Sequence, residues 1–246
     1  MTSLNTSNRR ALVTGGSGDI GGAICRALAA QGHHVYVQAH ANAARAQALV
    51  AAIRADAGAA DVVVFDITDA AATRAALDQL LRAGPIEVLV HNAGVHDDAP
   101  LAGMTDVQWR RVIDVSLHGF FHVTQPLLLP MARAKFGRIV SVSSVAAVLG
   151  NRGQVNYAAA KAALHGAARS LAREMAARGI TVNVVAPGVI AGKLSAAAFD
   201  AEQIRQLVPA ARAGTPEEVA ALVAFLCSPQ AGYINGQVIG INGGMG

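Results

Sequence analysis

Short apolar runs of strand length alternate with longer alanine-rich stretches along almost the whole chain. Seven runs are predicted to be strands, at residues 10–14, 34–38, 61–65, 86–90, 138–142, 180–185 and 237–241. Most are apolar at nearly every position, which is typical of strands buried on both faces. Six stretches between them are predicted to be helices, at residues 19–31, 42–57, 69–82, 105–133, 156–178 and 216–227. The alternation predicts an α/β fold with a doubly wound parallel sheet of about seven strands and helices on both faces.

Nothing in the composition divides the chain into smaller units. It has 246 residues, of which 53% are hydrophobic and 15% charged, and it contains no linker, repeat or low-complexity segment. Residues 1–9 are polar and are predicted to form a disordered tail, and residues 10–246 a single domain. The least regular stretch, from Gly188 to about Leu207, is a candidate lid.

Several kinds of protein are disfavoured by the composition. No apolar run is long enough to cross a bilayer, and the polar start lacks the apolar core of a signal peptide. Cys25 and Cys227 fall in predicted helices without a metal-ligand cluster, so we expect reduced core thiols in a cytoplasmic protein. The net charge of +4 comes from Lys and Arg residues scattered singly, so a nucleic-acid or membrane partner is not expected.

Tyr157 and Lys161 lie four residues apart in the sequence Tyr157-Ala-Ala-Ala-Lys161. On a helix such residues share a face, so the phenol and the ammonium would meet. The ammonium would favour the phenolate and lower a tyrosine pKa that is about 10 in the free residue. A proton donor of this kind is what carbonyl reduction requires, although the spacing alone is also common in structural pairs. Ser144, at the end of a predicted strand, is the third candidate for this site.

A glycine-rich turn, Gly15-Gly-Ser-Gly-Asp-Ile-Gly21, follows the first predicted strand and opens the first predicted helix. Glycines there let the backbone approach a pyrophosphate, which the N–H groups and dipole of the helix N-terminus stabilise. A turn in this position predicts a Rossmann-like dinucleotide site rather than only a tight connection.

The segment after the second predicted strand bears on which dinucleotide is bound. NAD sites usually hold a carboxylate there against the ribose 2′-hydroxyl. Here the segment is Gln38-Ala-His-Ala-Asn42, which has no carboxylate, and His40 and Arg45 are close by. We therefore expect NADP(H) as the cofactor.

These motifs occur in the same order in the short-chain dehydrogenase/reductase family, which the chain resembles from Arg10 to Gly246. The shared features are the turn at 14–21, Asp66, Asn92-Ala93-Gly94, the Ser144/Tyr157/Lys161 set, Pro187-Gly188 and a glycine-rich C-terminus. Within the family, residues 150–161 and 212–219 are most similar to those of 3-oxoacyl-[acyl-carrier-protein] reductases.

The resemblance implies a role for each candidate. Tyr157 would protonate the substrate carbonyl oxygen and Ser144 would hold it, while Lys161 would lower the Tyr157 pKa and hold the nicotinamide ribose. Gln154, Lys135 and Arg178 would contact the substrate or a carrier protein. The implied cofactor-binding residues are Gly15, Ser17, Gly18, Asp19, Ile20, Gly21, His40, Asp66, Ile67, Asn92, Ala93, Gly94, Tyr157, Lys161, Pro187, Gly188 and Ile190.

Three residues depart from the family pattern. Asp19 replaces the second glycine of the turn, where its charge would oppose that of a pyrophosphate unless it points to solvent as a capping residue. Ser116, a further catalytic candidate, stands where an asparagine usually completes the proton relay. Gly192 stands where a threonine often holds the nicotinamide carboxamide.

The sequence therefore predicts an NADPH-dependent enzyme of fatty-acid or other lipid biosynthesis. It would reduce a 3-oxoacyl thioester, bound to acyl-carrier protein or CoA, to the 3-hydroxyacyl product. The alternatives are a dehydrogenase of another small alcohol or ketone and a low-activity or non-catalytic partner subunit of a homologous reductase. The predicted helices at 105–133 and 156–178 are apolar on more than one side, and the resemblance implies a homotetramer that pairs them.

Overall fold

The fold is built on one parallel β-sheet. The computed structural model describes residues 8–40, 43–192 and 199–246. Its strands are hydrogen-bonded in the order β3-β2-β1-β4-β5-β6-β7, and every neighbouring pair is parallel. This confirms the predicted doubly wound sheet. The strands are β1 (Arg10–Thr14), β2 (His34–Ala39), β3 (Ala59–Val64), β4 (Val88–His91), β5 (Gly137–Val142), β6 (Ile180–Pro187) and β7 (Val238–Ile241).

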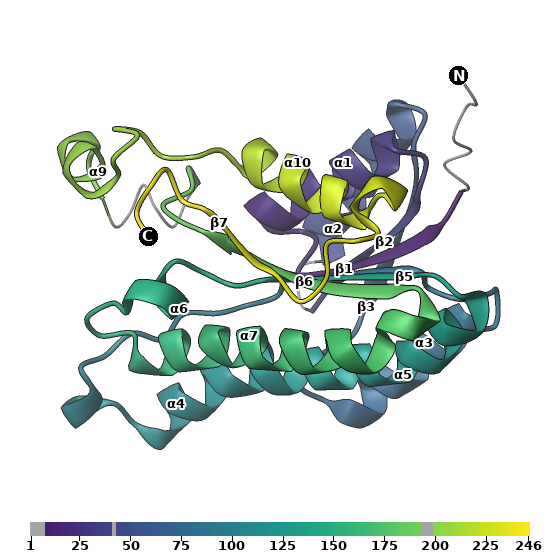
Figure 1. Cartoon of the computed structure of the whole chain (residues 1–246), viewed down its shortest axis with the longest axis horizontal. Coiled ribbons are helices and arrows are strands. Elements are labelled where there is room, and N and C mark those ends of the chain that lie inside the picture. The colour runs from purple at the N-terminus through teal and green to yellow at the C-terminus, as the bar shows by residue number, and fades with distance from the viewer. Residues whose placement is uncertain (1–7, 41–42, 193–198) are drawn as a thin grey trace.

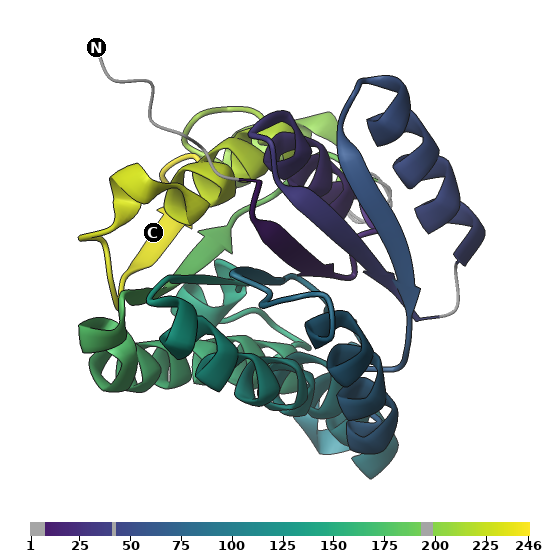
Figure 2. The same cartoon turned by 90° about the vertical axis from the view of Figure 1, so that its right-hand side faces the viewer.

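Helices cover both faces of the sheet (Figure 1). One face carries α1 (Asp19–Ala30), α2 (Ala43–Ala55) and α10 (Pro216–Cys227), and the other carries α3 (Ala70–Leu81), α4 (Asp106–Ile113), α5 (Gly119–Ala134) and α7 (Val155–Met175). Figure 2, turned by 90°, shows the same two layers of helices on either side of the sheet. Each layer encloses its own apolar core, because every residue of β4, β5 and β6 is buried and these strands present side chains to both layers.

The long helix expected over 105–133 is interrupted. A π-helical turn at Asp114–His118 separates α4 from α5. Such a turn is a single-turn interruption within a continuous helical stretch, so the prediction of one helix over 105–133 did not include it. Thr105 and Gln108 form the capping box that starts α4, as their spacing indicates.

Two short helices were not expected from the sequence. The first, α6 (Ala146–Leu149), follows β5, and the second, α9 (Ala201–Leu207), lies within the candidate lid. Asp200 caps α9 through Gln203 in the same way that Thr105 caps α4. Residues 193–198 of the candidate lid lie outside the described residues.

The contacts of the fold begin at Arg9. This residue was expected in the polar tail, but its guanidinium pairs with Glu87 at 2.7 Å and lies 3.4 Å from the centre of the Phe136 ring. Residues 1–7 of that tail lie outside the described residues. Cys25 and Cys227 are buried free thiols, as expected. Among the described residues, no helix is both long and apolar enough to cross a membrane.

Candidate active site

The candidate site lies at the carboxyl ends of the central strands. The sheet order reverses between β1 and β4, and ligands of open parallel sheets bind at such a switch point. The glycine turn follows β1, Asn92 follows β4 and Ser144 follows β5, so the predicted segments meet at one edge of the sheet.

Close contacts and hydrogen bonds with neighbouring segments fix the conformation of the glycine turn. Gly15 has a φ of +61°, and a Cβ atom at Gly21 would overlap the Gly15 carbonyl oxygen, so neither position accepts a side chain without rearrangement. The buried Gln38 accepts a hydrogen bond from the Gly15 N–H at 2.9 Å and donates one to the Phe65 carbonyl at 2.7 Å. Sequence reasoning did not assign Gln38 this role. The available signal was a polar residue at the end of an otherwise apolar strand.

Thr14 and Asn92 join the ends of β1 and β4. The Thr14 hydroxyl accepts hydrogen bonds from the Asn92 and Ala93 N–H groups at 3.0 and 3.1 Å. The Asn92 amide donates to the carbonyls of Thr14 and Gly15, both at 3.1 Å. Asn92 and Ala93 therefore fix the glycine turn against the neighbouring strand.

His91 completes this network inside the protein. Its Nε2 lies 2.9 Å from the Ser116 carbonyl, which can only accept, so Nε2 carries the proton. Burial and the charge of Lys161 lower the His91 pKa to about 3, so the ring is neutral at neutral pH. Its Nδ1 therefore accepts from the Thr14 hydroxyl at 3.3 Å. This role of His91 was not predicted, because its partners Thr14 and Ser116 are distant in the sequence.

Ser116 lies in the π-helical turn and is fully buried. Its hydroxyl has no hydrogen-bond partner among the described residues. Gly94 separates it from Lys161, since a Cβ at Gly94 would be 3.0 Å from Lys161 Nζ and 3.9 Å from Ser116 Oγ. The structure thus brings the fourth catalytic candidate to the same side of the cleft as Lys161.

The three main catalytic candidates are assembled as expected. Tyr157 and Lys161 lie on the first turns of α7, and Ser144 lies between β5 and α6. The side chains of Tyr157 and Ser144 are hydrogen-bonded. The Lys161 ammonium donates to the Val142 carbonyl at 2.8 Å and lies 5.8 Å from the centre of the Tyr157 ring.

Burial dominates the ionisation of this cluster. Tyr157 and Lys161 are only 9% and 2% exposed. Burial raises the pKa of Tyr157 to about 12, although the hydrogen bond to Ser144 opposes this, and it lowers the pKa of Lys161 to about 8. The expectation that Lys161 lowers the Tyr157 pKa is therefore corrected: burial of the phenol raises this pKa, and Ser144 rather than Lys161 opposes the rise.

The residues expected at the adenosine end lie together. His40 Nε2 is 3.6 Å from Asp66 Oδ2. Burial would raise the pKa of Asp66, but two hydrogen bonds from Thr68 and the charge of His40 outweigh it and lower the pKa. Ile67 is buried against α5, where a Cβ at Gly119 would lie 2.7 Å from its side chain.

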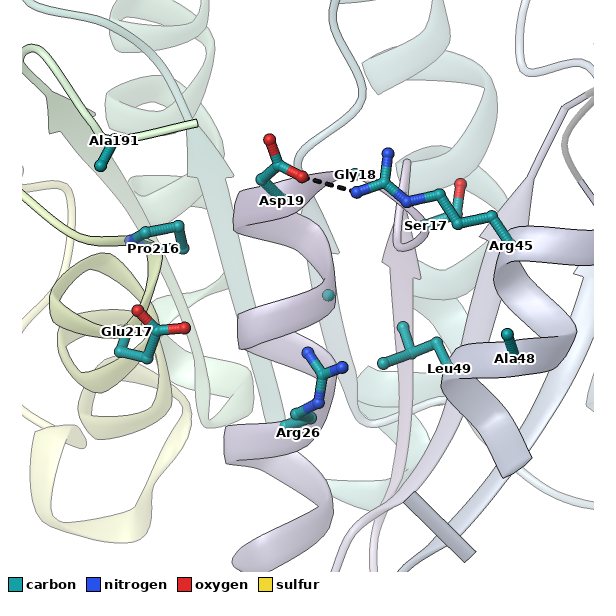
Figure 3. Close-up of a pocket in the computed structure, with 11 residues that line it drawn as sticks. Ser17, Gly18, Asp19, Arg26, Arg45, Ala48, Leu49, Ala191, Pro216 and Glu217 are labelled. Carbon is teal, nitrogen blue, oxygen red and sulfur yellow. Dashed lines mark hydrogen bonds and ion pairs between the residues drawn. The ribbon is translucent and has the colours of Figure 1, made fainter. Parts of the chain in front are cut away.

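Asp19 does not simply point to solvent as a capping residue. Gly18 is the N-cap of α1, and the Asp19 carboxylate pairs with Arg45 of α2 at 2.5 Å. Figure 3 shows this pair above a pocket of about 440 Å³ that is lined by Ser17, Arg26 and Leu49 among others. The pocket is on the α1–α2 side of the turn and does not include Ser144, Tyr157 or Lys161. The pairing offsets the acidic charge next to the glycine turn.

The segment after β6 approaches the same turn. The Pro187 carbonyl accepts from the Val145 N–H at 2.7 Å, and the Gly188 N–H donates to the Ile241 carbonyl at 3.0 Å. Ile190 forms an isolated bridge with Gly214. A Cβ at Gly192 would lie 2.8 Å from Asp19 Oδ2, so two of the departures from the family pattern contact each other.

The substrate-side candidates separate into two groups. Gln154 lies beside the catalytic cluster at the start of α7, where it donates to Asp98 at 2.7 Å. Lys135 and Arg178 lie at the carboxyl ends of α5 and α7, at the opposite edge of the sheet. Arg178 is therefore far from the cleft of its own chain, because α7 of 21 residues separates it from Tyr157 by about 30 Å.

These residues fit a dinucleotide. No side chain caps the N-terminus of α1, and the dipole at this end of the helix favours the negative charge of a pyrophosphate. At Gly15 and Gly21 an added Cβ would meet the backbone or Asn92, so the close packing of the turn requires glycine. The Ser116 hydroxyl lies buried near Lys161 without a partner in the described chain. Ser17, Gly18, Ile20 and Gly21 would hold the phosphates.

Comparison with known proteins agrees with this geometry. A family profile described as enoyl-(acyl carrier protein) reductase matches residues 16–246. A 3-oxoacyl-[acyl-carrier-protein] reductase of Synechocystis sp. is 43% identical over 241 residues, which cover 96% of each chain. The protein of the same name from Escherichia coli K12 is 40% identical over 245 residues, 98% of this chain and 99% of the relative. A third, from Staphylococcus aureus, is 40% identical over 240 residues, 96% and 98% of the two chains.

The profile and the relatives carry the names of two different reductases, and each matches nearly the whole chain. Together with the parallel sheet, the glycine turn and the assembled Ser144, Tyr157 and Lys161, they show that this chain is an NAD(P)-dependent oxidoreductase that belongs to the short-chain dehydrogenase/reductase family.

Proposed function

We propose that the protein reduces the 3-oxo group of an acyl thioester, carried by acyl-carrier protein, to the 3-hydroxyacyl product with NADPH. The observation that carries this proposal is the assembly of Ser144, Tyr157 and Lys161 beside the glycine turn. Its substrate follows the names of relatives that match nearly the whole chain, and on that basis we assign the protein to fatty-acid or other lipid biosynthesis.

The residues of the cluster divide the chemistry between them. The bound nicotinamide supplies the hydride. The Tyr157 hydroxyl donates its proton to the carbonyl oxygen, which the Ser144 hydroxyl holds in place. Burial keeps Tyr157 in its donor form well above neutral pH, and the Lys161 ammonium stabilises the phenolate once the proton has left.

The test is turnover by the purified protein. With NADPH and acetoacetyl-CoA, then with a panel of 3-oxoacyl-carrier-protein thioesters, we expect oxidation of NADPH and a 3-hydroxyacyl product. Turnover of small ketones or sugars without turnover of any thioester would favour a different dehydrogenase. Activity that requires co-purification with a homologous reductase would favour the partner-subunit alternative.

The preference for NADPH rests on His40 and Arg45, the basic residues near the end of β2. Arg45→Ala should raise KM for NADPH more than KM for NADH, because both dinucleotides lose the charge that offsets Asp19 and only NADPH also loses a partner for its 2′-phosphate. Arg26→Ala is the matched control, because Arg26 lines the same pocket lower on α1 (Figure 3). A wild-type preference for NADH in kcat/KM would contradict the assignment.

A homotetramer is proposed on apolar surface that a single subunit leaves open. Phe121 and Leu129 on α5 are 62% and 67% exposed. Exposed side chains of this size on one helix are typical of an interface. Light scattering at micromolar concentration should give four times the chain mass of 25.1 kDa. A monomer would contradict the proposal, and a cytoplasmic location stays a prediction.

A further inference from the structure

An imidazole ring lies flat against the catalytic phenol. The rings of His96 and Tyr157 are stacked, with centroids 4.1 Å apart and planes inclined by 26°. The hydrophobic side chains that pack with Tyr157 are aliphatic, among them Val112 and Ala160. His96 is therefore the aromatic side chain that covers one face of the Tyr157 ring.

The orientation of His96 is set by its neighbours. The Gln154 amide lies 3.3 Å from His96 Nδ1 and donates to Asp98 Oδ2 at 2.7 Å. An amide N–H can only donate, so Nδ1 accepts and Nε2 carries the proton of the neutral ring. The side chain of His96 remains 38% exposed, so one face covers the phenol and the ring edge is open to the cleft.

Hydrogen bonds to α7 and to α4 hold the segment that carries His96. The Ala99 N–H donates to the Gly153 carbonyl at 2.9 Å, and the Asn156 amide donates to the Asp97 carbonyl at 2.9 Å. On the other side, the Gln108 amide donates to the Asp97 carboxylate at 3.0 Å. These bonds connect the segment to α7 and α4, so the stacking does not depend on a loose loop.

Three charged or polar groups act on the stacked pair. Asp98 faces His96 at 3.9 Å and also raises the Tyr157 pKa through its charge. Lys161, on the same helix as Tyr157, opposes protonation of His96, and Ser144 is hydrogen-bonded to the phenol. Burial lowers the His96 pKa, so the ring is neutral at neutral pH and adds no charge beside the phenol.

We propose that His96 is a positioning residue for the catalytic acid: its ring fixes the plane of the Tyr157 phenol toward Ser144 and keeps water from the face of the phenol. The proposal rests on the proposed role of Tyr157. It adds a residue that neither the family motifs nor the sequence pattern assigned.

The experiment follows Tyr157 directly as well as through activity. The protein has three tyrosines, so ¹³Cζ-tyrosine labelling gives three NMR resonances, and Tyr157→Phe identifies the one from Tyr157. In the wild type this resonance should titrate with a pKa of about 12. In His96→Ala water should reach the phenol, and the pKa should move toward about 10. His96→Leu keeps the bulk without the aromatic ring, so the pKa should move in the same direction by less.

The kinetic expectations follow from the ring contact. Loss of an aromatic pair should lower kcat roughly 2- to 10-fold in His96→Ala and His96→Leu and leave the dissociation constant for NADPH unchanged. His96→Phe, which restores a flat ring, should return both kcat and the Tyr157 titration close to the wild type.

Unchanged titration of Tyr157 in folded His96→Ala and His96→Leu would overturn the proposal. So would His96→Phe that is as impaired as His96→Ala, because the nitrogen atoms rather than the ring would then matter. If the wild type reduced no thioester, the proposed function would fail, and the NMR titration would still decide whether His96 shields Tyr157.

Discussion

The two ends of the cleft accommodate polar groups in opposite ways. Around Tyr157 and Lys161 the surroundings are buried and apolar, so desolvation raises one pKa to about 12 and lowers the other to about 8. At the start of α1, Asp19 and Arg45 keep 37% and 46% of their side chains exposed and balance each other's charge.

This difference separates the effects of substitution. In the buried cluster a changed side chain alters a proton transfer, and the consequence should appear in kcat. At the glycine turn a changed side chain alters shape and charge at the cofactor, and the consequence should appear in KM. Asp19 is tolerated at the turn because Arg45 offsets its charge.

The largest effect is expected for the buried end. Tyr157→Phe keeps the ring and removes the proton, so kcat should fall roughly 10²–10⁴-fold, the usual contribution of general acid catalysis, with little change in NADPH affinity. Tyr233→Phe is the matched control, because Tyr233 is fully exposed. Near-normal turnover of Tyr157→Phe would exclude Tyr157 as the acid.

The second prediction concerns pH. The Lys161 ammonium loses its proton at about pH 8, whereas Tyr157 keeps its own to about pH 12. As pH rises, kcat/KM for the cofactor should therefore fall with an apparent pKa of about 8 that belongs to Lys161, since this ratio reports groups of the free enzyme. The arginine of Lys161→Arg stays charged over this pH range, so the fall in kcat/KM should disappear, even if the overall rate is lower. A limb that persists in Lys161→Arg would assign it to another group.

Sequence patterns were informative where a local signal decides the structure. The strands are predicted correctly because buried parallel strands are apolar at successive positions, and the proximity of Tyr157 and Lys161 is predicted because they share one helical face. Contacts between distant segments leave no such signal. The hydrogen bonds of His91 to Thr14 and Ser116 and the stacking of His96 on Tyr157 became visible only with the fold.

The departures from the family pattern also involve a contact between distant segments that the sequence does not indicate. In the sequence, Asp19 and Gly192 are separate anomalies, each expected to weaken cofactor binding. In the structure they are neighbours, and the glycine leaves the space that the carboxylate occupies. Compensation across 173 positions cannot be inferred from one sequence.

The third prediction tests this compensation at the exposed end of the cleft. Gly192→Thr should collide with the Asp19 carboxylate and weaken NADPH binding roughly tenfold, as overpacking by about 1–2 kcal/mol would. Adding Asp19→Gly should recover most of the affinity, and kcat should change little in either variant. Fluorescence titration with NADPH gives the dissociation constant for the wild type, both single variants and the double variant. Strictly additive effects on these constants would show that the two positions act independently.

The smallest effect is expected far from both ends, at the basic surface formed by Arg133, Lys135, Arg173 and Arg178. All four side chains are exposed, and within the described chain none takes part in an ion pair. Arg178 lies about 30 Å from the Tyr157 of its own chain, because 21 residues of mainly helical chain separate them. In a two-fold dimer that pairs α5 and α7 antiparallel, this surface of one subunit would lie beside the cleft of the other. Docking of a carrier protein at Lys135 and Arg178, which the family resemblance implies, therefore depends on the proposed oligomer.

Lys135→Glu and Arg178→Glu should each raise KM for a carrier-bound 3-oxoacyl substrate roughly two- to fivefold, because an exposed charge contact contributes about 0.2–1 kcal/mol. Added salt should shrink the effect, as it screens the encounter. Activity on acetoacetyl-CoA should barely change, since this small thioester needs no protein docking. Arg82→Glu is the matched control, because Arg82 is exposed and lies at the end of α3, outside the paired helices. Equal losses on both substrates would show that Lys135 and Arg178 support the assembly rather than the carrier, and a monomeric wild type with the same selective losses would place the docking surface on a single subunit.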